Sequence, residues 1–145
     1  MKLSNHFSLE ELCSSQTAAR KGIDNTPGAA VIENLTKLAA ALEKVRALVG
    51  QPIAVSSGYR SPALNAAIGG ARNSAHCYGL AADIFAPGMP PLILARAIKS
   101  SKIQYDQLIY EGTWVHIGLS SGQQRRQNLT ATFSNGSVSY QEGIA

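Results

Sequence analysis

Residues 74–86 read SAHCYGLAADIFA, and the second half of this segment decides the fold. The run from Leu80 to Ala86 is apolar except for Asp83, and Gly79 and Pro87 bound it. A short apolar run between such residues is typical of a buried strand. We therefore expect a strand here whose one carboxylate has a special purpose.

The part of the chain before this strand is predicted to be mainly helical. Ser8 and Glu11 form a capping box, which predicts a short helix after Ser8. We expect a loop over residues 17–25 and then a long helix that is capped by Thr26 and begins at Pro27. This helix ends at Gly50. Apolar residues recur along it at steps of three and four, the spacing of a helix packed on a core, at Val31, Leu35, Leu38, Leu42, Val45 and Leu48.

Shorter elements surround the central strand. Residues 53–56 are predicted to form a strand, and Ser61-Pro62 starts one or two helical turns. A second amphipathic helix is expected from Pro90 to about Ser101. Residues 108–110 and 114–119 are expected to form a hairpin that turns around Glu111. Helices followed by strands predict an α+β fold.

Composition is that of one soluble domain spanning residues 1–145, with 45% hydrophobic and 15% charged residues. Its core motifs lie between residues 55 and 119, and residues 120–145 form either an edge strand or a loose tail. The net charge is +4 and the pI about 9.3, but the basic residues are scattered. No basic helix or aromatic–basic stripe indicates nucleic-acid binding. We expect a monomer.

The first residues lack the apolar core of a signal peptide, and no apolar run is long enough to span a bilayer. We therefore expect synthesis in the cytoplasm and no membrane insertion. If the target lies outside the cell, the protein must reach it after release or as a component of a virion.

Asp83 is the most informative single residue. A carboxylate inside an apolar strand is costly to bury unless it is paired or bound to a metal. An ion pair with Arg60 would satisfy it, as would hydrogen bonds that cap a nearby loop, or a metal ion. Alternation along the strand puts Asp83 on the same face as Ala81 and Phe85.

His116 has a similar setting, between Val115 and Ile117. Alternation places Trp114, His116 and Gly118 together on one face of the expected strand. A lone buried histidine is more often a satisfied core residue than a ligand. Together with His76 and Asp83, however, His116 would complete the three protein ligands of a catalytic zinc site.

Three motifs resemble the M15 family of zinc peptidases. They are Ser57-Gly58-Tyr59-Arg60-Ser61-Pro62, then Ser74-x-His76-x-x-Gly79-x-Ala81-x-Asp83, then Trp114-x-His116. The family contains D-alanyl-D-alanine carboxypeptidases (its subfamily A among them) and phage peptidoglycan peptidases. The resemblance implies a small α+β domain of the hedgehog/DD-peptidase type, with N-terminal helices packed on a central antiparallel sheet. It also implies one zinc ion and cleavage of peptide bonds in the peptidoglycan stem peptide.

Carried over by position, His76, Asp83 and His116 match the family's zinc ligands. Arg60 matches its substrate-binding arginine, which we count among the catalytic residues because its fork suits a terminal carboxylate or the scissile carbonyl. Tyr59, Ser74 and Trp114 are expected to contact substrate. The M15 resemblance predicts all of these roles.

The general base departs from the family pattern. Many members carry an acidic residue three positions before the last histidine, where this chain has Thr113. The nearest carboxylate is Glu111, which we predict to be the base, with Asp106 as the alternative.

Two functions follow from these residues. The first is a zinc metallopeptidase that hydrolyses stem peptides, as a carboxypeptidase or as an endolysin-type endopeptidase. The second is a non-catalytic module that binds peptidoglycan or a partner and keeps the fold and a structural zinc, which Thr113 would favour. A structural site normally has a fourth protein ligand, and only Cys77 could supply it.

Overall fold

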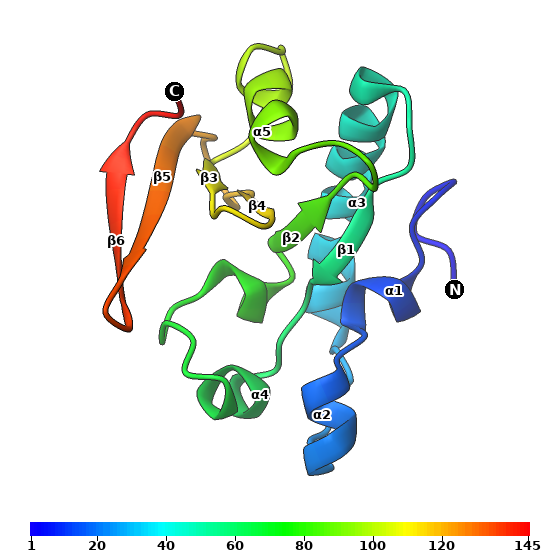
Figure 1. The fold of residues 1–145 in the computed structure, drawn as a ribbon. Coiled ribbons are helices and arrows are strands. Elements are labelled where there is room, and N and C mark those ends of the chain that lie inside the picture. Colours follow the sequence, from blue (N-terminus) through cyan, green and yellow to red (C-terminus); the bar gives the residue numbers. More distant parts are fainter.

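The computed structural model describes residues 1–145 and begins with three helices (Figure 1). They are α1 (Leu9–Cys13), α2 (Gln16–Lys21) and α3 (Ala29–Val49). The Ser8 cap of α1 is confirmed, since the Ser8 hydroxyl accepts the Glu11 amide proton at 3.1 Å, whereas the reciprocal bond from the Ser8 amide to the Glu11 carboxylate is not observed.

Two boundaries differ from the prediction. Part of the expected loop over residues 17–25 is helix α2, because the Ser15 hydroxyl caps it by accepting from the Ala18 amide at 3.1 Å. The long helix begins at Ala29 and not at Pro27. Thr26 does not cap it, because the N-cap residue is Gly28; the Thr26 amide instead donates to the Asp24 carboxylate at 2.9 Å.

The rest of the chain alternates between short helices and strands, close to the expected positions. The elements are β1 (Ala54–Ser57), α4 (Pro62–Ala67), the 3-10 helix η1 (Ala75–Tyr78), β2 (Ala81–Phe85), α5 (Pro91–Lys99), β3 (Gln107–Tyr110), β4 (Val115–Gly118), β5 (Gln127–Ser134) and β6 (Ser137–Glu142).

All six strands form one sheet in the order β1-β2-β4-β3-β5-β6. Every neighbouring pair is antiparallel except β3 and β5, which are parallel. The expected α+β fold with helices packed on a central sheet is therefore confirmed. Residues 120–145 contribute two strands, which form a hairpin on the edge of the sheet next to β3 (Figure 1).

The two faces of the sheet have different roles. One face packs against α3 and α5, and alternation places Ile84 of β2 and Ile117 of β4 on it, both fully buried. The predicted helical stripe is largely confirmed, with Leu35, Leu38, Leu42 and Val45 fully buried, whereas Leu48 at its end is exposed. The opposite face carries Asp83 and His116.

The C-terminal hairpin is tied to the same core. Ile144, just after β6, is 2% exposed and belongs to the core cluster. Lys99 and Arg96 of α5 donate to the carbonyl oxygens of Ile144 and Ala145 at 2.7 and 2.6 Å. None of the helices combines the length and the apolar character needed to cross a membrane.

Candidate metal centre

Three side chains from three different elements meet on the sheet face opposite the helical core. His76 comes from η1, Asp83 from β2 and His116 from β4. Each offers a nitrogen or oxygen atom that lies within 4.8 Å of the other two. The Asp83 Oδ1 atom is 3.4 Å from His76 Nε2 and 3.1 Å from His116 Nδ1. The group could hold one metal ion.

His76 is held in place by its backbone surroundings. The Ser74 hydroxyl caps η1 by accepting the His76 amide proton at 3.2 Å. The His76 Nδ1 atom donates to the Gly58 carbonyl at 2.7 Å. Since a carbonyl oxygen only accepts, this bond requires a proton on Nδ1, and Nε2, which faces Asp83, is the ring atom left to bind a metal.

The register of the sheet places the other two candidate ligands. Asp83 lies directly opposite His116 across the β2–β4 pair, so the two side chains point to the same face. Gly118 lies two residues further along that face and gives the imidazole room. A Cβ atom at Gly118 would lie 3.4 Å from His116 Nε2.

Electrostatics keeps Asp83 ionised. Burial raises the pKa of this carboxyl, but hydrogen bonds and charges from His116 and His76 outweigh burial and hold the pKa well below its usual 3.8. The site thus offers one anionic oxygen and two imidazoles. That set suits Zn²⁺, which takes nitrogen and oxygen ligands and needs three from the protein in a catalytic site.

Arg60 lies next to this group. Its backbone amide donates to the His76 carbonyl at 3.1 Å, which ties the loop after β1 to η1. The Arg60 Nη2 atom is 3.4 Å from the Ser74 hydroxyl, and its Nε atom is buried without a hydrogen-bond partner. Arg60 makes no ion pair with Asp83, so the ion-pair explanation of Asp83 is not observed.

Glu111 and Trp114 lie at the turn between β3 and β4. The Trp114 indole donates to the Glu111 carboxylate at 3.2 Å. Burial raises the pKa of Glu111, and the charge of Asp83 raises it further, while His116, Trp114 and His76 act in the opposite direction. Glu111 therefore lies within the electrostatic field of all three candidate ligands.

Asp106 lies at the opposite end of β3 and is already engaged. Arg125 holds its carboxylate with two side-chain hydrogen bonds of 2.9 Å. This pairing lowers the pKa of Asp106. The geometry therefore favours Glu111 over Asp106 as a group able to exchange a proton near the metal centre.

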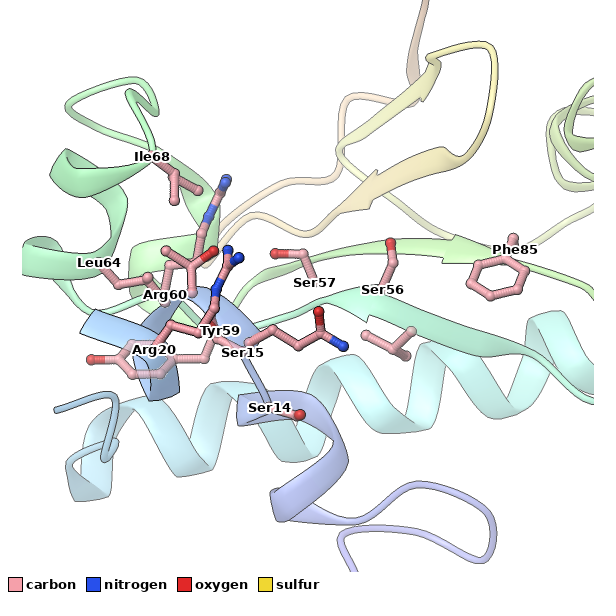
Figure 2. Close-up of a pocket in the computed structure, with 13 residues that line it drawn as sticks. Ser14, Ser15, Arg20, Ser56, Ser57, Tyr59, Arg60, Leu64, Ile68 and Phe85 are labelled. Atoms are coloured by element: carbon pink, nitrogen blue, oxygen red, sulfur yellow. The ribbon is translucent and has the colours of Figure 1, made fainter. Parts of the chain in front are cut away.

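A cavity of about 620 Å³ lies beside β1 (Figure 2). None of the three candidate ligands lines it, but Ser57 does, and Ser57 pairs with Asp83 across the β1–β2 ladder. Arg60 and Tyr59 also line it, although Tyr59 is only 7% exposed and packs with the core. The cavity and the metal centre are thus neighbours.

Two residues that position the site were not identified from the sequence. Gly58 supplies the carbonyl that orients His76, and a Cβ there would lie 2.2 Å from the Leu12 carbonyl oxygen. Asn25 binds the carbonyl oxygens of Cys13 and Tyr59 and the amide of Ser61, which fixes the Arg60 loop. Hydrogen bonds to backbone atoms of this kind cannot be predicted from the spacing of residues in the sequence.

Cys77 is not part of the three-residue group. Its thiol is half-buried, and burial raises its pKa. A fourth protein ligand, which a closed structural zinc site normally has, is therefore not present in this group.

The fold and the site agree with the comparison with known proteins. The model of the peptidase M15 family matches residues 5–118, and the chain belongs to this family. Over 97 residues the chain is 35% identical to the zinc D-Ala-D-Ala carboxypeptidase of Streptomyces albus G. The match covers 66% of this chain and 37% of that protein, so the chain corresponds to well under two thirds of the relative's length.

These matches confirm the family predicted from the three motifs. They also support zinc as the cofactor, since the relative is a zinc enzyme and three side chains here could hold one ion. The matched region ends at Gly118, so both strands of the C-terminal hairpin lie outside it.

Proposed function

We propose that this chain is a zinc-dependent metallopeptidase that hydrolyses peptide bonds in peptidoglycan stem peptides. The observation that carries the proposal is the convergence of His76, Asp83 and His116 in a chain of the peptidase M15 family. The named activity of the Streptomyces relative supports the substrate class. His76, Asp83 and His116 would be the metal ligands.

A zinc ion held by these three side chains would supply Lewis acidity and activate a water molecule at neutral pH. Glu111 takes a proton from the attacking water as the new C–O bond forms. It then gives that proton to the amine nitrogen when the C–N bond breaks. The raised pKa of Glu111 suits a group that must hold the proton between these steps.

The remaining residues orient the peptide. The buried Nε atom of Arg60 has no partner within the protein, so the guanidinium can donate to the scissile carbonyl or to a terminal carboxylate. The Ser74 hydroxyl holds Arg60 next to His76, because it accepts hydrogen bonds from the Arg60 guanidinium and from the His76 amide. Trp114 holds the Glu111 carboxylate through its indole nitrogen. Tyr59 and Trp114 are the proposed apolar contacts of the substrate.

The test is release of amino groups from purified peptidoglycan, with products identified by mass. We expect activity in the parent protein, loss of about 10²–10⁴-fold in kcat for Glu111→Gln with zinc still bound, and loss of both zinc and activity for His116→Ala. Glu33→Gln, on the exposed surface of α3, is the matched control. Free D-alanine as product would indicate a carboxypeptidase, and larger fragments an endopeptidase.

The second candidate function is a module that binds the cell wall without cleaving it. Thr113 stands where many M15 members carry an acid, which favours a non-catalytic wall-binding module. A parent protein that binds zinc and peptidoglycan but releases no amino groups would establish that module. Cleavage in the wall would further agree with a role in lysis, after release from the cytoplasm or from a virion.

A further inference from the structure

The cavity beside β1 is lined by two arginines, and the proposed mechanism uses only Arg60. Arg20 of α2 and Arg60 are its only charged lining residues, and no acidic side chain lines it. Neither arginine forms an ion pair within the chain. Figure 2 shows both together with the hydroxyl groups that share the wall, at Ser14, Ser15, Ser56 and Ser57.

Two guanidinium groups on one cavity repel each other unless an anion lies between them. Helix α2 places Arg20, an exposed residue, at this cavity, and the helix is capped by Ser15 at one end and by Gly22, with a φ of 65°, at the other. Guanidinium forks bind carboxylates through two parallel hydrogen bonds, and serine hydroxyls add further donors. The lining therefore matches an anionic group with planar geometry.

We propose that this cavity is a subsite for an acidic side chain of the substrate peptide, with Arg20 as the residue that reads its carboxylate. The inference rests on the proposed peptidase function. Its position supports it, because Arg60 and Ser57 connect the cavity to the metal centre through the His76 carbonyl and the Asp83 backbone. A peptide with its scissile bond at the metal centre would place a neighbouring residue beside β1.

The experiment compares two synthetic stem-type peptides that differ only in one side-chain carboxylate, free in one and amidated in the other. We expect the parent protein to prefer the acidic peptide by about tenfold in kcat/KM, as for a charge-assisted hydrogen bond. Arg20→Gln should remove that preference and leave cleavage of the amidated peptide within about twofold. Lys21→Gln, an equal charge removal on the same helix outside the cavity, should keep the preference.

Equal cleavage of both peptides by the parent protein, or an equal loss on both in Arg20→Gln, would overturn the inference. Calorimetric binding of the two peptides to the Glu111→Gln variant separates the subsite from catalysis. If the parent cleaves neither peptide while the acidic one still binds more tightly in an Arg20-dependent way, the peptidase proposal fails and the subsite stands.

A second inference rests on the register of the sheet. Glu111 pairs with Trp114 through its amide, and it follows Tyr110, which lies opposite Thr130 of β5. The next residue of β5 is Ala131, which lies opposite Tyr140 of β6. Glu111, one residue beyond the paired part of β3, is thus in line with Ala131 of β5 and Tyr140 of β6, and Trp114 lies opposite Glu111 across the turn.

This row lies on the face that carries the metal centre. His116 is opposite Ile109, and Glu111 lies two residues beyond Ile109, on the same side. Ala131 is small, so no bulky side chain of that row separates the Tyr140 ring from Glu111. The pKa of Tyr140 is raised by burial and also by the charges of Glu111 and Asp83, which agrees with this proximity.

We infer that Tyr140 contacts the substrate from the Glu111 side of the centre, with its hydroxyl donating a hydrogen bond to a peptide carbonyl. The residue is 51% exposed, so the phenol is accessible to a ligand. It belongs to the hairpin outside the region matched by the M15 family model. This hairpin would then supply a specificity element outside the matched region.

Tyr140→Phe removes the hydroxyl, and Tyr140→Leu also removes the ring. We expect Tyr140→Phe to lower kcat/KM by about tenfold without changing the melting temperature, and Tyr140→Leu to lower it further. Gln141→Ala, on the other face of β6, is the control and should stay within about twofold of the parent. The affinity of a product peptide is also measured for the Glu111→Gln variant and for the double variant Glu111→Gln/Tyr140→Phe. This comparison tests the contact of Tyr140 independently of turnover.

Parent-like kcat/KM and product affinity in Tyr140→Phe would overturn this inference and leave the peptidase proposal intact. A loss that follows a lowered melting temperature would also count against it, because that pattern indicates a structural role. If the parent protein neither cleaves nor binds the peptides, both the Tyr140 inference and the peptidase proposal are wrong.

Discussion

At Glu111, the surroundings that suit a general base also make the ionised side chain unfavourable before a metal binds. Burial and the nearby charge of Asp83 raise the pKa of this carboxyl above its ordinary 4.5. A raised pKa means that the folded state binds the proton more tightly than the unfolded state. The stability that this group contributes is therefore present below about pH 4.5 and is lost as pH rises through the folded-state value.

The prediction concerns the metal-free protein. Glu111→Gln should raise its melting temperature at pH 8, where the parent carries the ionised carboxylate, and change it little at pH 4. Thermal unfolding in the presence of a chelator measures both values. A shift of equal size at the two pH values would contradict the account, since neither burial of charge nor repulsion by Asp83 would then be the cause.

At the scale of the element, the loop that joins β1 to α4 positions both Arg60 and His76. At Gly58 this loop lies so near α1 that an added Cβ atom would be 2.2 Å from the Leu12 carbonyl oxygen. The neighbouring Tyr59 amide donates to that same oxygen at 2.7 Å. The loop can therefore not move away from α1 without losing a backbone hydrogen bond.

We predict that Gly58→Ala destabilises the protein by about 1–3 kcal/mol, as forced repacking does. It should also weaken metal binding, because the Gly58 carbonyl orients the His76 ring. Denaturant unfolding and metal titration measure the two effects. Gly28→Ala is the matched control, since a Cβ there meets nothing within 4 Å and the backbone φ of −81° is ordinary. Metal affinity equal to that of the parent would refute the positional role.

The elements also show why sequence reasoning succeeded where it did. Helix α3 and strand β2 follow from local periodicity, and Asp83 and His116 were recognisable because each interrupts an apolar run. The parallel pairing of β3 with β5, and the Gly58 carbonyl behind His76, depend on contacts between distant parts of the chain. The position of Arg20 at the cavity could not be predicted, because its segment was expected to be a loop and is helix α2. The position of Tyr140 near Glu111 follows only from the pairing of β3, β5 and β6.

At the scale of the whole molecule, the metal centre would add a direct link between η1 and two neighbouring strands of the sheet. His76 lies in η1, outside the sheet, whereas Asp83 and His116 lie on neighbouring strands. An ion bound by all three would add a link that the unfolded chain cannot reproduce, because the site depends on the pairing of β2 with β4 and on the position of η1. Binding to the folded state then appears directly as stability.

We therefore expect zinc to raise the free energy of unfolding by about 2.7 kcal/mol when its free concentration is 100 times its Kd. A chelator should reverse the gain, and the melting temperature should fall accordingly. Asp83→Asn and His116→Ala should abolish the response to zinc. Cys77→Ser should retain it, because the thiol is outside the three-residue group. Differential scanning calorimetry with and without zinc provides the measurement. A zinc response that persists in both ligand variants would mean that the ion binds elsewhere on the chain.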